Sequence, residues 1–320
     1  MSFIKITIYS LLFLILNSGI SYSNGDTIKL FKSLTDKKFI FSSQYGNKEE
    51  LPDNAKFCID EVLKNSNSTN YYGLNAAHGN MDHDTYSEGS RYSNDLQETV
   101  EYAEDTLLFL KKIGFFKTLR NKKMKPAIMF DIDNTLAFTS EHDDDETGNS
   151  PEIKETSNFV RKYCFKDNLE CYFITARSCS SKEYKATYRW LKNVFNFNET
   201  ILKRNLYLTG NLKGCEKSRF ERVAYKDLLK SALSKKYNIF WIMSIGDQLT
   251  DVFGENSGIK ILIPNRLFKS SIVPHANKKE DCGLDTVVKP SNECIQKFKS
   301  VIINRTNQDN CRNCSSPEGC

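Results

Sequence analysis

Short apolar runs separated by amphipathic segments dominate the middle of the chain. Five of these runs show no alternation of apolar and polar residues, and they lie at 127–133, 170–175, 205–209, 238–246 and 259–263. Uninterrupted apolar runs of this length predict strands that are buried on both faces. Helical patterns at 182–195 and 219–236 separate some of them. The pattern therefore predicts an α/β fold with a parallel sheet of about five strands flanked by helices.

A helix is expected before the first of these strands. Apolar residues recur at the spacing of an amphipathic helix between Asn94 and Gly114, at Leu96, Val100, Ala103, Leu107 and Leu110. The preceding segment, 24–92, is polar and shows no sustained period. We interpret it as an N-terminal extension of short helices and loops, which leads into the helix.

The first residues have the pattern of a secretory signal peptide. Lys5 precedes an apolar run at 6–16, and small and polar residues follow up to Ser23. A membrane anchor is the alternative, but it would need about 20 apolar residues. We therefore expect a signal peptide at about 1–23, a secreted product and no membrane span in the mature chain. Four glycosylation triplets fit this route, at Asn67, Asn198, Asn304 and Asn313.

All ten cysteines follow the predicted signal peptide, as a disulfide framework in a secreted protein requires. Five lie before residue 220 and five after residue 280. If all ten pair, at least one disulfide must join the two groups. We expect a disulfide-rich C-terminal tail, 271–320, packed on the rest of the chain, while the pairing itself stays open. Zinc binding by Cys311 and Cys314 is the alternative, which the lack of a nearby His disfavours.

Acidic residues follow two of the predicted strands at the point where each strand ends. Asp131 and Asp133 come at the end of the first strand, and Asp247 and Asp251 follow the fourth. The carboxyl ends of parallel strands meet at one edge of a sheet, where ligands bind. Acids gathered there are costly to bury unless a cation compensates their charge. The sequence therefore predicts a Mg²⁺ site at this edge.

Two further side chains could reach the same edge. Thr175 ends the second strand, and Lys226 lies at the head of the helix that precedes the fourth strand. The alternatives are that Thr175 is only a β-branched strand residue and that Lys226 is a solvated helix lysine. In the second case Lys213 or Lys217 could supply the cation instead.

The full combination of these residues resembles the haloacid dehalogenase superfamily of aspartate-nucleophile phosphatases. Within it, the segments FDIDNTL, ITAR, VAYK and SIGDQLTD are similar to those of plant-type secreted acid phosphatases (subfamily IIIB) and their bacterial class B and C relatives. The resemblance covers roughly 92–268 and implies a Rossmann-like phosphatase domain, which we place at 93–270. The chain departs from the family pattern at four positions, where Glu, Gly, Trp and Arg are usual: Asn134, Ala176, Leu249 and Lys230.

The resemblance implies a two-step mechanism. Asp131 would be the nucleophile that forms an aspartyl-phosphate, and Asp133 would be the general acid and base. Thr175 and Lys226 would bind the phosphoryl oxygens.

The resemblance also implies the ligands of the metal. Mg²⁺ would be held by the carboxylates of Asp131 and Asp247 and by the backbone carbonyl of Asp133, with Asp251 acting through water.

A different phosphatase chemistry is suggested by the spacing of Cys171 and Arg177, which fits the C-x₅-R pattern of thiol-nucleophile enzymes. That chemistry needs an anion-binding loop between the two residues, whereas the intervening residues lack glycine and are typical of a strand. We therefore expect Cys171 to form a disulfide.

Charge narrows the range of substrates. The net charge of +5 is a small excess, whereas nucleic-acid binding needs clustered basic residues. An acidic segment at 141–146 is most simply a solvated loop, but beside the site it would repel polyanions. We therefore expect a secreted, Mg²⁺-dependent acid phosphatase acting on small phosphomonoesters, with no nucleic-acid partner. The alternatives are a dedicated nucleotidase and a non-catalytic storage or binding protein on the same fold; the presence of Asp131 favours an enzyme.

Overall fold

The structure is a computed structural model, and it describes residues 31, 71–72, 91–139, 150–210, 215, 219–247, 249–252, 254–263 and 291–303. Several predictions fall outside these residues. They concern the signal peptide at 1–23, the acidic segment at 141–146, the alternative lysines Lys213 and Lys217, and the glycosylation triplets at Asn67, Asn304 and Asn313.

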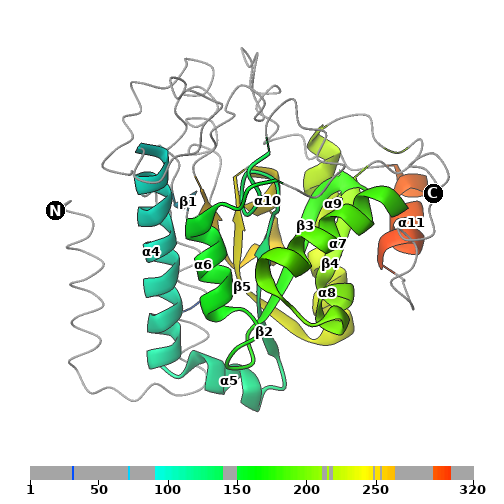
Figure 1. Cartoon of the computed structure of the whole chain (residues 1–320). Coiled ribbons are helices and arrows are strands. Elements are labelled where there is room, and N and C mark those ends of the chain that lie inside the picture. The colour runs from blue at the N-terminus through cyan, green and yellow to red at the C-terminus, as the bar shows by residue number, and fades with distance from the viewer. Residues whose placement is uncertain are drawn as a thin grey trace, which may run out of the picture.

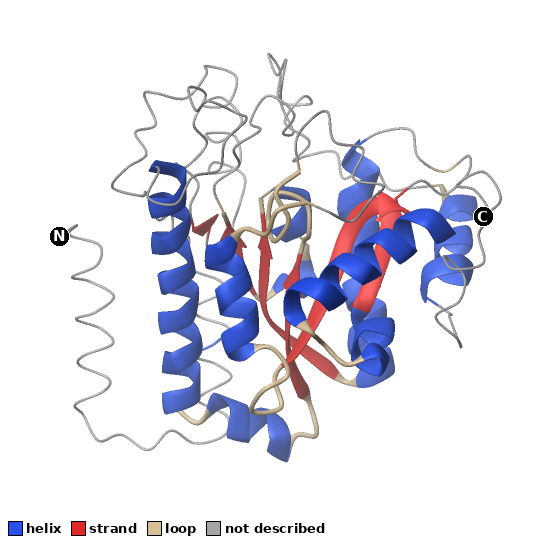
Figure 2. Ribbon diagram, viewed as in Figure 1, coloured by secondary structure: helices blue, strands red, loops and turns tan. Residues whose placement is uncertain are grey.

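A parallel sheet forms the centre of the molecule (Figure 2). Its strands are ordered β1-β6-β5-β2-β3-β4, and every neighbouring pair is parallel. The strands are β1 (Tyr71–Tyr72), β2 (Lys125–Phe130), β3 (Glu170–Ser178), β4 (Leu206–Gly210), β5 (Ile239–Gly246) and β6 (Ile259–Leu262). The five longer strands correspond to the five predicted apolar runs, so the predicted α/β class is confirmed. The two-residue edge strand β1 was not predicted.

Helices cover both faces of the sheet (Figure 1). Within the described residues they are α4 (Arg91–Lys112), α5 (Phe115–Asn121), α6 (Lys154–Tyr163), α7 (Ser181–Phe195), α8 (Glu199–Asn205), α9 (Arg219–Tyr237), α10 (Leu249–Val252) and α11 (Asn292–Phe298), with a 3₁₀ turn η2 (Glu255–Ser257) and a π-helical turn η4 (Lys299–Ile303). The predicted helix before the first strand is α4, and Gly114 after it has the left-handed φ of 75° that ends a helix.

The order of the strands explains the two helical layers. From β2 the chain moves outward to β3 and β4, with α6 and α7 in the connections. Because crossovers between parallel strands are right-handed, these two helices lie on one face. The chain then returns past β2 to β5, so α9 lies on the opposite face (Figure 1). The direction of winding reverses between β2 and β5, and ligands bind beside such a reversal.

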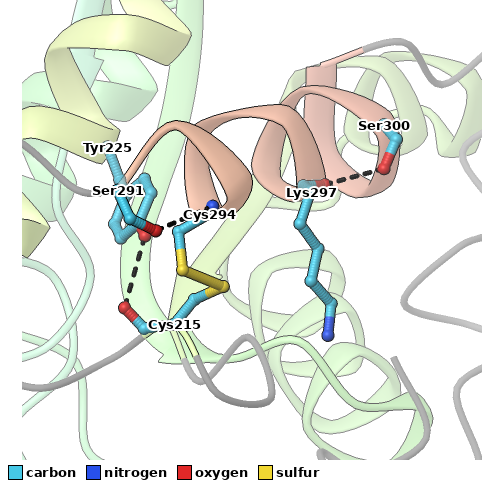
Figure 3. Close-up of a disulfide and its surroundings, with 6 residues drawn as sticks. All are labelled: Cys215, Tyr225, Ser291, Cys294, Lys297 and Ser300. Atoms are coloured by element: carbon cyan, nitrogen blue, oxygen red, sulfur yellow. Dashed lines mark hydrogen bonds between the residues drawn. A yellow bond between two sulfur atoms is a disulfide. The ribbon is translucent and has the colours of Figure 1, made fainter.

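Two disulfides have both partners among the described residues. Cys164 pairs with Cys171 between the end of α6 and the start of β3. Cys215 pairs with Cys294 of α11 (Figure 3), which is a bridge of the kind that the split of the cysteines into two groups predicts. As expected, Cys171 is therefore not a thiol nucleophile. No helix in the described part of the chain is both long enough and apolar enough to cross a membrane.

Candidate functional site

The register of the sheet brings the ends of three strands together. Phe130 at the end of β2 pairs with Ile245 of β5 on one side and with Phe173 of β3 on the other. Beyond this level the backbone N–H of Asp131 donates to the Ile245 carbonyl at 3.0 Å. Asp131 and Asp247 therefore leave the sheet side by side, at the point where the winding of the fold reverses.

Three carboxylates meet at this point. Asp131, Asp247 and Asp251 each offer an oxygen, and these oxygens all lie within 4.8 Å of one another. The three residues are only 5%, 4% and 2% exposed. Asp251 comes this close because Gly246 has no side chain: a Cβ at Gly246 would collide with the side chain of Asp251. The Gly-Asp-x-x-x-Asp spacing thus has a steric reason.

Lys226 of α9 supplies a positive charge to the cluster. Its Nζ lies 2.8 Å from Asp131 Oδ1 and 2.6 Å from Asp251 Oδ1, and the residue is 1% exposed. Burial by itself would lower the pKa of this lysine, but the adjacent carboxylates of Asp131 and Asp251 outweigh that effect and raise its pKa. Lys226 is therefore a charged lysine inside the site and not a solvated one.

The cluster is suited to a divalent cation. Burial, reinforced by the neighbouring Asp251, raises the pKa of Asp131 to about 7, because Lys226 offsets only part of the negative charge. The pKa of Asp247 is also raised well above its ordinary value by burial and by the other two carboxylates. Three carboxylates against one ammonium group leave an excess of negative charge, and carboxylate oxygens are the ligands that Mg²⁺ prefers.

The turn after β2 connects the two acidic motifs. Thr135 Oγ accepts a hydrogen bond from the backbone N–H of Asp247 at 3.2 Å and lies 3.4 Å from its Oδ1. The turn requires a left-handed residue at Asn134, whose φ is 52°. Asn tolerates this conformation better than most residues with a side chain. Asn134 therefore suits the turn, although Glu is usual at this position in the family that the sequence resembles.

Asp133 lies beside the triad and is held by an arginine. The guanidinium of Arg177 donates to both carboxylate oxygens of Asp133, with Nη2 2.7 Å from Oδ1 and Nε 3.0 Å from Oδ2. Thr175 Oγ donates to the same carboxylate at 3.2 Å. The remaining arm of Arg177 reaches Thr187 Oγ at 3.0 Å. Asp133 is therefore oriented by two residues of β3.

All six predicted site residues lie at this edge of the sheet. Asp131, Asp247, Asp251 and Lys226 form one buried cluster, and Thr175 joins Asp133 beside it. Their chemical roles remain predictions, as does metal binding by the Asp133 carbonyl.

Arg177 was not predicted to be a site residue. Its position did carry a signal, because side chains two residues apart on a strand share a face, and Arg177 is two residues after Thr175.

Comparison with known proteins gives a likeness in structure but none in sequence family. No protein-family model and no curated protein matches the chain. Among solved structures, the chain is similar to the class C acid phosphatase from Bacillus anthracis, with 17% sequence identity and a TM-score of 0.41. The similarity covers 60% of this chain and 89% of that chain. At this level of similarity, the residues of the site must decide the function.

Proposed function

We propose that the chain is a secreted, metal-dependent phosphatase that hydrolyses small phosphomonoesters through a covalent intermediate on Asp131. The observation that carries this proposal is the buried cluster in which Asp131 shares Lys226 with Asp251 and lies beside Asp247. A carboxylate nucleophile for phosphate needs nearby positive charge, because both reactants are anionic. Lys226 meets that need from the protein side.

The first step forms an ester between Asp131 and the phosphoryl group. A carboxylate oxygen of Asp131 attacks phosphorus while the bond from phosphorus to the leaving oxygen breaks. Asp133 gives its proton to that oxygen, and an alcohol leaves. Lys226 and Thr175 bind the phosphoryl oxygens, whose negative charge must be held during transfer.

The second step releases phosphate. Asp133, now a carboxylate, takes a proton from a water molecule as the water attacks phosphorus. The bond between phosphorus and Asp131 breaks, and the products are inorganic phosphate and the free Asp131 carboxylate. Arg177 holds the Asp133 carboxylate between these steps through its two-point contact.

The carboxylates of Asp131, Asp247 and Asp251 are the groups that would hold the metal ion. When bound, a divalent cation such as Mg²⁺ would offset the repulsion between these carboxylates and an anionic phosphate. The cysteines that pair within the described residues fit the oxidising environment of a secreted protein.

Hydrolysis of an aryl phosphate by the purified, disulfide-bonded chain tests the proposal. We expect turnover with Mg²⁺ and its loss with EDTA. Asp131→Asn should abolish turnover without changing the circular dichroism spectrum. The control Asp105→Asn, on the exposed side of α4, should keep the turnover of the wild type. Hydrolysis retained by Asp131→Asn would refute the assignment of the nucleophile. No hydrolysis by the wild type would favour the storage or binding protein, and a phosphomonoester panel would identify a dedicated nucleotidase.

A further inference from the structure

A short C-terminal segment packs against the helix that carries Lys226. Within it, Cys294, Phe298 and Ile302 are 8%, 0% and 0% exposed. The segment begins with α11, a helix of only seven residues that Ser291 caps by accepting a hydrogen bond from the Cys294 N–H at 3.2 Å (Figure 3). A helix of this length is not stable by itself in water, so its order depends on its packing and on its tether.

The tether is the disulfide between Cys294 and Cys215, which are 79 residues apart in sequence. Cys215 lies in the connection between β4 and α9, so the bridge fastens the C-terminal segment at the entrance of α9.

Tyr225 contacts both sides of this bridge. Its hydroxyl donates to the Cys215 carbonyl at 3.4 Å (Figure 3), and its ring lies 4.6 Å from the ring of Phe298, measured between centroids. The residue is 1% exposed. The ring of Tyr225 is therefore enclosed by the bridge and by the helix that the bridge holds in place.

Tyr225 directly precedes Lys226 on α9. Consecutive residues of a helix point about 100° apart, so Tyr225 faces the C-terminal segment while Lys226 reaches Asp131 and Asp251. A movement of this turn of α9 moves both side chains together. An error of about 1 Å in the position of a catalytic group can cost on the order of 100-fold in rate.

We propose that the Cys215–Cys294 bridge and α11 position Lys226 for catalysis, with Tyr225 as the positioning residue that connects them. This inference rests on the proposed function, because it concerns how Lys226 is positioned in the same site. The bridge thus contributes to the rate of the reaction as well as to stability.

The test removes the bridge in the full chain with Cys215→Ser/Cys294→Ser. The matched control is Cys164→Ser/Cys171→Ser, which removes the bridge at the start of β3, the end of that strand farther from the site. At a temperature where both variants are folded by circular dichroism, we expect kcat to fall about tenfold or more in the first and less than about twofold in the control. Unchanged kcat in the first variant would overturn the proposal.

A second comparison separates positioning from a general loss of structure. If the bridge acts through Lys226, its removal should have no further effect in the Lys226→Ala background, because coupled residues are not additive. A loss of kcat that persists in that background would show a merely structural role. Should the double cysteine variant fail to fold, Phe298→Ala replaces it, and the same pattern is expected.

Amide hydrogen exchange measures the coupling without turnover. Removal of the Cys215–Cys294 bridge should speed exchange in residues 219–230 of α9, whereas removal of the control bridge should not. This readout keeps the two proposals distinct: absent hydrolysis by the wild type refutes the phosphatase, whereas unchanged exchange in α9 refutes the coupling.

Discussion

Lys226 and Asp251 form an ion pair of 2.6 Å in which the two side chains are only 1% and 3% exposed. Lys226 contacts Asp131 from the same Nζ, so one ammonium group compensates two buried carboxylates. Removing one partner of a buried ion pair leaves an uncompensated charge and is far more costly than removing an exposed one.

Lys226→Met should therefore destabilise the metal-free protein. We expect the free energy of unfolding in EDTA at pH 7 to fall by about 3–5 kcal/mol. Lys226 lowers the pKa of Asp131, so without Lys226 the Asp131 carboxyl binds a proton more readily in the folded chain, and the loss should be smaller at pH 5. Urea unfolding measures both values. Lys235→Met, at an exposed position of α9, is the control and should change stability little. A loss of similar size in both variants would contradict the assignment of Lys226 as the cation that compensates the buried carboxylates.

Metal binding should stabilise the folded chain. A ligand at 100 times its dissociation constant stabilises a protein by about 2.7 kcal/mol. We expect the midpoint of thermal unfolding to be higher with Mg²⁺ than with EDTA. Asp247→Asn should remove that rise because it deletes a carboxylate of the triad. Asp105→Asn should keep the wild-type rise. A rise that survives in Asp247→Asn would place the ion somewhere else.

The contact between Arg177 and Asp133 should act on the chemical steps. Arg177→Lys keeps the positive charge but loses the planar two-point contact with the carboxylate. Because Asp133 is proposed to move protons while bonds break, kcat should fall about tenfold or more with KM little changed. Steady-state kinetics on an aryl phosphate measures this. Arg189→Lys, at an exposed position of α7, provides the comparison, and equal kcat in the two variants would rule out a role for Arg177.

The sequence was most informative where burial is continuous. The strand from Lys125 to Phe130 is buried at every position after the first, and such a run can be recognised without alternation. By contrast, α6 escaped prediction because its first turn buries the polar residues Glu155, Thr156 and Ser157. Their burial depends on partners distant in sequence, such as Ser93, which hydrogen-bonds Glu155. Local periodicity carries no record of such contacts.

The site, too, has a part that the sequence predicts and a part that it does not. The acidic residues could be predicted because each follows a strand, and parallel strands end at one edge. The partner of Cys215 could not be predicted, since nothing near it in sequence specifies Cys294. The alternation of side chains along β3 is enough to predict that Arg177 shares a face with Thr175. Its contact with Asp133 could not be predicted, because it depends on the register between β2 and β3.

Lys230 provides a test of pH dependence away from the proposed chemistry. It lies one turn after Lys226, is fully buried, and donates a hydrogen bond to Ser257 Oγ. Burial lowers its pKa to about 7 from an ordinary value of 10.5, although Asp227 opposes the shift. Between these two values the unfolded chain binds a proton that the folded chain does not. This group therefore makes the free energy of unfolding rise with pH, by up to about 1.4 kcal/mol per pH unit.

Lys230→Met should remove this contribution. Below pH 7 both states of the wild type carry the proton, so the cost of burying the charge is greatest there and declines as pH rises toward 10.5. The change in stability on substitution should therefore be more favourable at pH 7 than at pH 9, by about 2–3 kcal/mol. The lost hydrogen bond to Ser257 applies at both pH values and does not alter the difference. Urea unfolding at pH 7 and pH 9 measures this difference, with Lys235→Met as the exposed control. If Lys230→Met changed stability equally at the two pH values, Lys230 would have to be charged in the folded chain throughout this range.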